Sequence, residues 1–137
     1  MLICFDTHII LDVVLQREPF SKESAKVLSL VEIPDHTGML CATTLTNLHD
    51  LTRRTLGEAG ARQNIGNFLQ VMELAMVTRA VVNAAIRSEM TDFEDAVLAC
   101  AAHLAGAQAI ITRNLRDFAK SPVRAYTPTQ FLALQAV

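Results

Sequence analysis

The 137-residue sequence has no tryptophan, one tyrosine and three cysteines. Aromatic side chains are a common platform on which proteins stack single-stranded bases, so their scarcity gives little support to recognition of bases by stacking. Cys4, Cys41 and Cys100 stand in apolar surroundings without CxxC spacing, and none of the four histidines belongs to an HExxH motif. This pattern favours buried thiols in a reducing compartment over disulfides or a zinc site.

The sequence also lacks a strong charge and a long apolar run. A net charge of −2 excludes a broad positively charged surface for binding nucleic acid, although it is compatible with a local basic patch. The stretch AVLACAAHLAGAQAII is shorter than the roughly 20 residues of a membrane span and contains His103 and Gln108. No basic segment precedes the first apolar run, so we expect no signal peptide, no membrane association and a cytoplasmic location.

Short apolar segments alternate with segments of helical periodicity along the whole chain. We expect strands at residues 2–5, 39–43, 75–78, 107–112 and 123–126. We expect helices at residues 7–15, 21–33, 44–56, 59–73, 79–88 and 92–105, and a closing helix from Thr127. This alternation predicts an α/β fold with a parallel sheet, and the length fits one domain spanning residues 1–137.

Several residues predict where the helices begin and end. Ser21 is a candidate N-cap of the second helix, and Gly57 is expected to end the third. Thr91 and Glu94 fit a capping box for the helix at 92–105. Thr127, followed by a proline and then by a glutamine two residues later, predicts a similar start for the closing helix.

Polar residues follow the strands of the expected sheet. Asp6 comes directly after the first strand, Asn47 lies one helical turn after the second, and Thr112 closes the fourth. Ligands of parallel α/β sheets bind beyond the carboxyl ends of the strands, so these three residues are expected to line one site.

Further carboxylates belong to the same part of the expected fold. Asp92 and Asp95 are three residues apart and therefore share one side of a helical turn, where the helix N-terminus favours the ionised form of Asp95. Asp117 lies in the loop after the fourth strand. Carboxylates that gather in one place repel one another unless a divalent cation neutralises them, and oxygen ligands suit Mg²⁺ or Mn²⁺. Taken singly, Asp6 and Asp92 also fit N-caps, and Asp117 fits an ordinary loop residue.

Three segments resemble the conserved blocks of PIN-domain proteins. FDTHIILDVV is similar to the first block, ATTLTNLHDLTRR to the second, and DFEDAVLACAAHLAGAQAIITRNLRDF to the third and fourth. The resemblance covers nearly the whole chain in the right order. It implies a three-layer α/β/α sandwich with a central parallel sheet of four to five strands. It also implies an Mg²⁺- or Mn²⁺-dependent endoribonuclease, such as the VapC-type toxins of type II toxin–antitoxin pairs.

The resemblance also implies roles for individual residues. Asp6, Asp95 and Asp117 match the acidic metal ligands of the family, although its last acid often stands at the position of Asn114. Thr112 matches a hydroxyl at the end of a strand, suited to a metal-bound water or a phosphate. Asp92 is a further candidate for the site.

The second block departs from the family pattern. Asn47 stands where the family usually has glutamate, and His8 replaces a common asparagine. An amide oxygen is a weaker ligand than a carboxylate, so the site has one negative charge fewer unless Asp50, one turn further on, substitutes. This departure supports an alternative hypothesis, in which the protein is a catalytically degenerate PIN domain that binds RNA or another protein.

Basic residues flank the acidic ones in the sequence. Arg113 and Arg116 surround Asp117, and Arg53 follows Asn47 on the same expected helix. Such a distribution suits the phosphate backbone of RNA approaching a metal, whereas any single arginine also fits a solvated surface.

The helix expected at residues 59–73 carries apolar residues at helical spacing, namely Ile65, Phe68, Leu69 and Met72. Packing within the domain is the simpler interpretation. A homodimer interface or a groove for a cognate antitoxin is the alternative, and the PIN resemblance implies that homodimers are common.

Overall fold

The computed structural model describes residues 1–135. The strands are β1 (Leu2–Phe5), β2 (Thr37–Cys41), β3 (Met72–Ala75), β4 (Ala109–Ile111) and β5 (Ala125–Tyr126). The helices are α1 (Thr7–Val14), α2 (Ser21–Leu28), α3 (Ala42–Val71), α4 (Arg79–Arg87), α5 (Phe93–Leu104) and α6 (Pro128–Gln135), with 3₁₀ turns η1 (Ser29–Glu32) and η2 (Leu115–Phe118). All five strands are parallel and lie in the order β3-β2-β1-β4-β5, so the predicted parallel sheet is confirmed.

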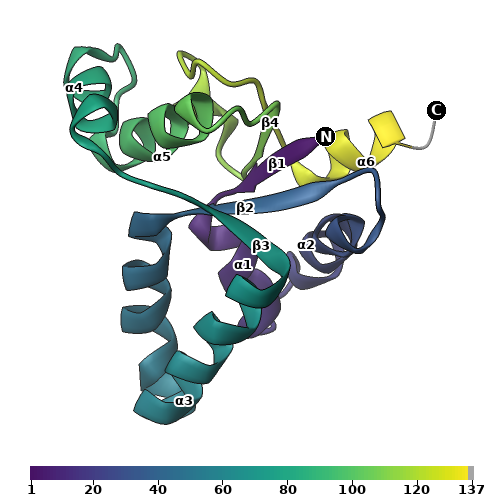
Figure 1. The fold of residues 1–137 in the computed structure, drawn as a ribbon. Helices are drawn as coiled ribbons and strands as arrows, with labels where there is room; N and C mark the ends of the chain where they lie inside the picture. Colours follow the sequence, from purple (N-terminus) through teal and green to yellow (C-terminus); the bar gives the residue numbers. More distant parts are fainter. Residues whose placement is uncertain (136–137) are drawn as a thin grey trace.

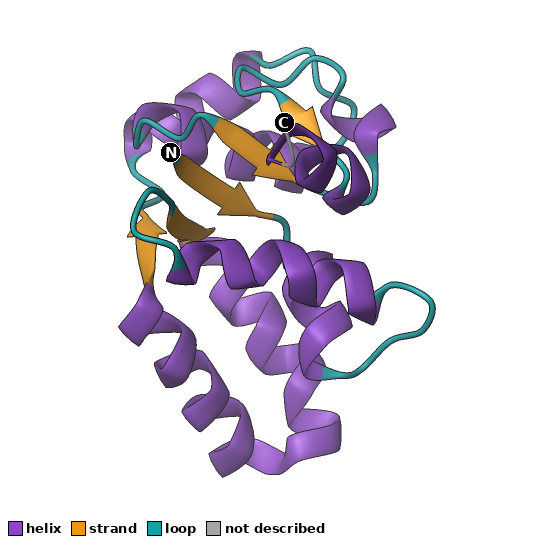
Figure 2. Cartoon of the chain, turned by 90° about the vertical axis from the view of Figure 1, so that its right-hand side faces the viewer, coloured by secondary structure: helices purple, strands orange, loops and turns teal. Residues whose placement is uncertain are grey.

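Helices cover both faces of this sheet (Figures 1 and 2). Alternate residues of a strand point to opposite faces. In β1, Cys4 therefore packs in the core under α4 and α5, whereas Ile3 and Phe5 pack in the core formed with α1, α2, α3 and α6. The three-layer α/β/α sandwich expected from the sequence is confirmed.

Helix α3 has two arms that meet at Gly57. This glycine has φ of +75°, a left-handed conformation that favours glycine, and the chain reverses direction there (Figure 1). Near the bend, His49 of the first arm lies 2.6 Å from the Glu58 carboxylate, which also pairs with Arg62 of the second. The expected pair of helices separated by Gly57 is therefore confirmed.

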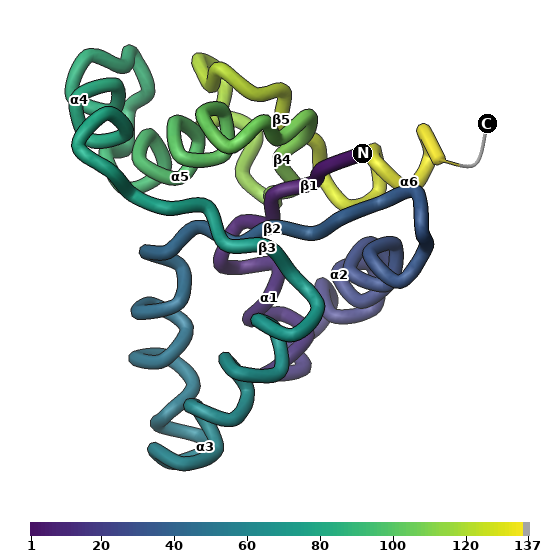
Figure 3. Tube along the Cα trace, in the orientation of Figure 1, coloured from purple at the N-terminus to yellow at the C-terminus, as the bar shows by residue number. Residues whose placement is uncertain are grey.

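Strand β3 begins three residues earlier than the sequence predicts. Its first residue, Met72, pairs with Gly38, and its last, Ala75, pairs with Cys41, so the register with β2 decides which apolar residues become the strand. Met76 and Val77 belong instead to the connection that leads the chain from the α3 layer to α4 on the other side of the sheet (Figure 3).

Helix α2 is shorter than expected, and its predicted cap is wrong. The Ser21 hydroxyl donates to the Glu18 carboxylate at 2.9 Å rather than to its own helix, and the chain becomes 3₁₀ after Leu28. Pro34 disfavours helical backbone at the residue before it, which helps to end this segment. The predicted start of α6 is confirmed, since Thr127 and Gln130 exchange backbone-to-side-chain hydrogen bonds of 3.1 Å.

The order of the strands places a switch point between β1 and β4. The chain moves outward from β1 to β2 and β3, and then returns to the other side of β1 to form β4 and β5. Side chains after β1 and β4 therefore border the crevice in which ligands of such sheets bind. Among residues 1–135, no helix is long and apolar enough to span a membrane.

Candidate active site

Asp6 is fixed at the switch point by both of its carboxylate oxygens. It follows β1 directly and caps α1, with Oδ1 accepting from the Thr7 backbone amide at 2.8 Å, so its expected N-cap geometry is present. Oδ2 accepts from the Thr112 hydroxyl at 2.8 Å. Burial raises the pKa of Asp6 above its ordinary value, although the Thr112 hydrogen bond and nearby His8 oppose the shift. Asp6 is only 8% exposed, and within residues 1–135 its carboxylate forms no salt bridge.

The loop after β4 is linked to Asp6 through Thr112. The Thr112 hydroxyl, itself fully buried, accepts from the Asn114 amide at 3.1 Å while donating to Asp6. The side-chain amide of Asn114 in turn donates to the carboxylate of Asp117, which lies within η2. The two candidates for the last acidic position, Asn114 and Asp117, are thus hydrogen-bonded to each other.

The start of α5 differs from the expected capping box. Asp92 is the N-cap, and its Oδ1 accepts from the Asp95 amide at 2.9 Å. Thr91 lies outside the helix, so Glu94 is not its capping partner. Asp92 is better suited to the cap because its short carboxylate reaches the third helical amide directly.

Glu94 faces the site instead. Its carboxylate accepts a hydrogen bond from the side-chain amide of Asn47 on α3. The sequence does not reveal this contact, because it joins residues 47 positions apart and the T-x-x-E pattern indicates a local role for Glu94. An acidic side chain therefore lies opposite the position where the PIN resemblance expects a glutamate.

Asp95 lies in a crowded group of carboxylates. Partial burial, reinforced by the charges of Asp6, Asp92, Asp117 and Glu94, raises the pKa of Asp95 to about 7. With this pKa, Asp95 of the metal-free protein is only partly ionised near neutral pH, so the ionised form is less favoured than the helix N-terminus alone would predict. Burial and four like charges outweigh the favourable effect of the helix dipole.

Two cavities meet at Asp6 and His8. One, of about 290 Å³, is bordered by α1, α3 and α5, and its lining includes Asn47, Asp50, Glu94 and Asp95. The other, of about 360 Å³, continues toward Arg113 and Asn114 in the loop after β4. The structure thus brings Asp6, Asp95 and Asn47 together, as the sequence predicts.

The donor set fits a hard divalent cation. The carboxylates of Asp6, Asp95 and Asp117 offer the oxygen atoms that such an ion prefers. Positive charge would also relieve the repulsion that, together with burial as the larger cause, raises the pKa of Asp95. Within residues 1–135, no group of three or more His, Cys, Asp or Glu side chains is placed so that it could hold a metal ion by itself. Solvent water and phosphate oxygens commonly complete such sites for Mg²⁺.

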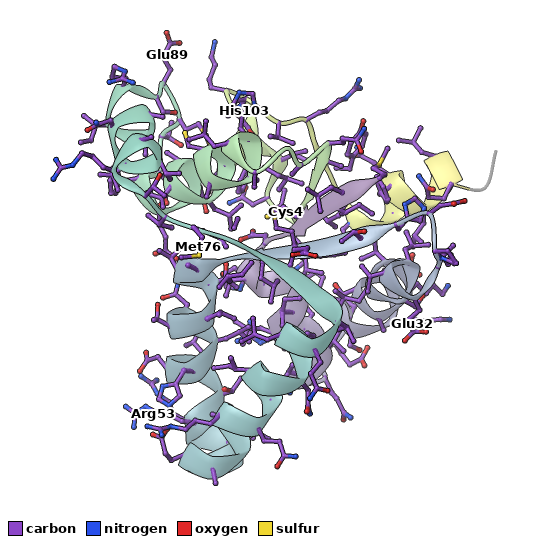
Figure 4. All side chains as sticks on the ribbon, in the orientation of Figure 1. Cys4, Glu32, Arg53, Met76, Glu89 and His103 are labelled. Carbon is purple, nitrogen blue, oxygen red and sulfur yellow. The ribbon has the colours of Figure 1, made fainter. Side chains whose placement is uncertain are left out.

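The three arginines considered as RNA contacts have different environments. Arg116 is exposed beside Asp117. Arg53 points outward from the first arm of α3 (Figure 4), where it lies 3.6 Å from Asp50. The guanidinium of Arg113 instead forms a bidentate pair with Asp12, a fully buried residue that sequence reasoning did not single out. A carboxylate inside the apolar helix THIILDVV was the available signal.

The family model described as "PIN domain" matches residues 2–116. The chain belongs to the PIN-domain family. The acidic residues at the switch point are therefore those of a PIN domain with Asn47 in its second block. A search of curated proteins finds no significant match.

Solved structures with the same fold include toxins of toxin–antitoxin systems. A toxin–antitoxin complex from Klebsiella pneumoniae matches with a TM-score of 0.70 and 23% identity over 91% of this chain and 96% of that one. VapBC-1 from nontypeable Haemophilus influenzae matches with a TM-score of 0.71 and 16% identity over 94% and 99%. VapC20 from Mycobacterium tuberculosis, described as a sarcin–ricin loop cleaving toxin, matches with a TM-score of 0.63 and 17% identity over 79% and 86%. At these identities the likeness shows a shared fold.

Proposed function

We propose that this PIN domain is a metal-dependent endoribonuclease that hydrolyses phosphodiester bonds of RNA. The observation that carries the proposal is the group of carboxylates from Asp6, Asp95 and Glu94 around one cavity at the switch point of the sheet. A similar structure from M. tuberculosis is described as a sarcin–ricin loop cleaving toxin, which supports RNA as the substrate class.

Asp6, Asp95 and Asp117 would bind Mg²⁺ or Mn²⁺. The ion, when bound, would lower the pKa of a water molecule and balance the charge of the phosphodiester. Thr112 contributes by donating to Asp6, which leaves this carboxylate in one orientation. Asn114 acts similarly on Asp117, and Asp92 fixes the first turn of α5 from which Asp95 projects.

The basic side chains nearby would contact the RNA backbone. Arg116 and Arg53 are both exposed and near acidic residues of the site. Exposed arginines bind phosphates without reading sequence, so they would add affinity and salt dependence rather than specificity.

We assign the protein the biological role of toxin in a type II toxin–antitoxin pair, acting in the cytoplasm. Its structural relatives from Klebsiella pneumoniae and Haemophilus influenzae come from toxin–antitoxin assemblies, which supports a cognate antitoxin as partner. Homodimerisation is proposed on the family resemblance. Leu69, at 42% exposed, is available on α3 for such contacts, whereas Phe68 packs against the domain core.

A second candidate function is a degenerate PIN domain that binds RNA or protein without cleavage. Asn47 favours it, because the Asn47 amide donates to Glu94 and so presents a donor where a metal ligand is expected. The substitution Asn47→Glu distinguishes the two. A large gain in RNA cleavage would identify a competent scaffold whose native site is impaired.

The direct test is cleavage of labelled single-stranded RNA with Mg²⁺, Mn²⁺ or EDTA. Asp6→Asn and Asp95→Asn are compared with Asp35→Asn, a matched change at an exposed loop residue. We expect metal-dependent cleavage in the wild type and in Asp35→Asn, and a loss of more than about 100-fold in the other two.

Each other outcome has a clear meaning. Cleavage that survives in Asp6→Asn and Asp95→Asn would come from a contaminating nuclease or another site, and would refute the assignment. Folded wild-type protein that cleaves no RNA with any metal would favour the binding module.

A further inference from the structure

Asp12 is a fully buried residue of α1, and its carboxylate contacts Ser24 of α2 and Arg113 of the loop after β4. Its Oδ2 accepts from Arg113 Nε at 2.8 Å and from the Ser24 hydroxyl at 3.2 Å, and its Oδ1 accepts from Arg113 Nη2 at 3.1 Å. A buried charge is costly unless it is paired and hydrogen-bonded, and Asp12 satisfies both conditions. The partner comes from the loop directly after β4, 101 residues further along the chain.

The Arg113 guanidinium is fixed on a second side by an aromatic ring. Its central carbon lies 3.8 Å from the centre of the Phe20 ring, in the segment between α1 and α2. This arrangement requires arginine. The guanidinium is planar and has two N–H donors side by side, so it can bind a carboxylate through two hydrogen bonds and stack on a ring, whereas the ammonium of lysine can do neither. The side chain therefore has one well-defined position.

This position matters because Arg113 stands between two residues of the candidate site. Thr112 on one side donates to Asp6, and Asn114 on the other donates through its backbone to Thr112 and through its side chain to Asp117. Asp6 caps α1, the helix that carries Asp12. The loop after β4 is thus connected to α1 at two points, through Thr112–Asp6 and through Arg113–Asp12.

We propose that Arg113 is a positioning residue, which uses Asp12 as its anchor to fix the loop after β4 so that Thr112 and Asn114 orient Asp6 and Asp117. This role rests on the proposed nuclease function and differs from the phosphate contact expected for Arg113 from the sequence. Arg113 acts on the reaction through the carboxylates that its neighbours orient.

The test compares Arg113→Met, Arg113→Lys, Asp12→Asn and the double variant Asp12→Asn/Arg113→Met. The matched control is Arg87→Met, at an exposed arginine at the end of α4. Four quantities are measured: kcat and KM for RNA cleavage, Kd for Mn²⁺ alone, the salt dependence of RNA binding, and amide hydrogen exchange at residues 112–118. The double variant removes both charges together, so it keeps the test valid where a single change leaves the chain unfolded.

Loss of the anchor should lower kcat and weaken Mn²⁺ binding by about 10–100-fold, as expected when support of a metal ligand is removed. KM and the salt dependence should stay close to wild type, and exchange at residues 112–118 should accelerate. Arg113→Lys should not restore kcat, because a charge alone does not replace the bidentate fork. The double variant should lose no more kcat and Mn²⁺ affinity than the more impaired of the two single variants, since both residues act as a unit.

Two results would overturn the proposal. In the first, Arg113→Met raises KM and reduces, by about 1, the slope of the logarithm of the RNA-binding constant against the logarithm of salt concentration, while Asp12→Asn behaves like wild type. This result would make Arg113 a phosphate contact. Unchanged kcat, Mn²⁺ affinity and exchange in the double variant would make the pair irrelevant to the site. If wild-type protein binds Mn²⁺ and Asp6→Asn does not, either result leaves the nuclease proposal standing. Wild-type protein without Mn²⁺ binding or cleavage would refute both.

Discussion

Helix α1 connects two buried aspartates with opposite surroundings. Asp12 is fully buried and is paired with a bidentate guanidinium and a serine hydroxyl. Asp6 is 8% exposed and receives one hydroxyl and one amide hydrogen bond, while the carboxylates of Glu94 and Asp95 lie near it. Asp12 is neutralised by a side chain of the fold itself, whereas Asp6 has no such partner among the described residues and is proposed to bind a divalent cation. Structure and function thus use the same residue type six positions apart.

The largest effect on stability should come from unpairing Asp12. Arg113→Met leaves a fully buried carboxylate without a cation, which should lower the free energy of unfolding by about 3–5 kcal/mol. Urea unfolding of this variant and of Asp12→Asn/Arg113→Met measures the effect. The double variant should recover part of the loss, and equal losses in both would show that the unpaired charge is not the cause.

A smaller effect is expected where a carboxylate is added to the crowded group. In EDTA, Asn47→Glu places a second negative charge next to Glu94 and should lower the free energy of unfolding by about 1 kcal/mol. The double variant Asn47→Glu/Glu94→Gln keeps the number of negative charges, so its stability should be close to that of wild type. Equal stability of Asn47→Glu and wild type without metal would contradict the close contact of these two residues.

The charge of Asp95 should make the metal-free protein less stable at higher pH. Its folded pKa of about 7 lies above its ordinary value of 3.8, so the folded state binds the proton more tightly than the unfolded state. The corresponding stability is complete below about pH 4 and is lost as the pH rises through 7. The raised pKa of Asp6 acts in the same direction.

Thermal unfolding in EDTA between pH 5 and pH 8 checks this expectation. The midpoint of wild-type protein should fall with rising pH more than that of Asp95→Asn. Excess Mn²⁺ should reverse the trend, because the ion binds the ionised carboxylates. A midpoint that rises equally in both proteins would contradict the assigned direction.

The smallest effect on stability is expected for Asp6 itself. Without metal, Asp6→Asn removes a buried charge while an amide can keep hydrogen bonds with Thr7 and Thr112, so the free energy of unfolding should change by no more than about 1 kcal/mol. A loss of unfolding free energy as large as that of Arg113→Met would contradict the proposed difference between Asp6 and Asp12.

The sequence predicts those features that depend on neighbouring residues. The strand before Asp6, the bend at Gly57 and the caps around Thr127 follow from local patterns, and parallel topology then brings Asp6 and Thr112 to one edge. The register of β3 against β2 is a different matter, since pairing with Gly38 decides it and no local pattern contains that information.

The side-chain contacts that the sequence did not reveal around the site join residues far apart in the chain. Asp12 meets Arg113 across 101 positions, and Asn47 meets Glu94 across 47. Each side chain had a plausible local explanation, a phosphate contact for Arg113 and a capping box for Glu94. Only the three-dimensional arrangement distinguishes the carboxylate that is already paired from those that face the cavity.

The most direct test of this account is a Mn²⁺ titration of metal-free protein followed by electron paramagnetic resonance. Wild-type protein and Asp35→Asn should bind Mn²⁺ with similar Kd, and Asp6→Asn should weaken binding by more than about 100-fold while remaining folded. Equal Mn²⁺ binding by wild-type protein and Asp6→Asn would contradict the claim that the charge of Asp6 serves a divalent cation.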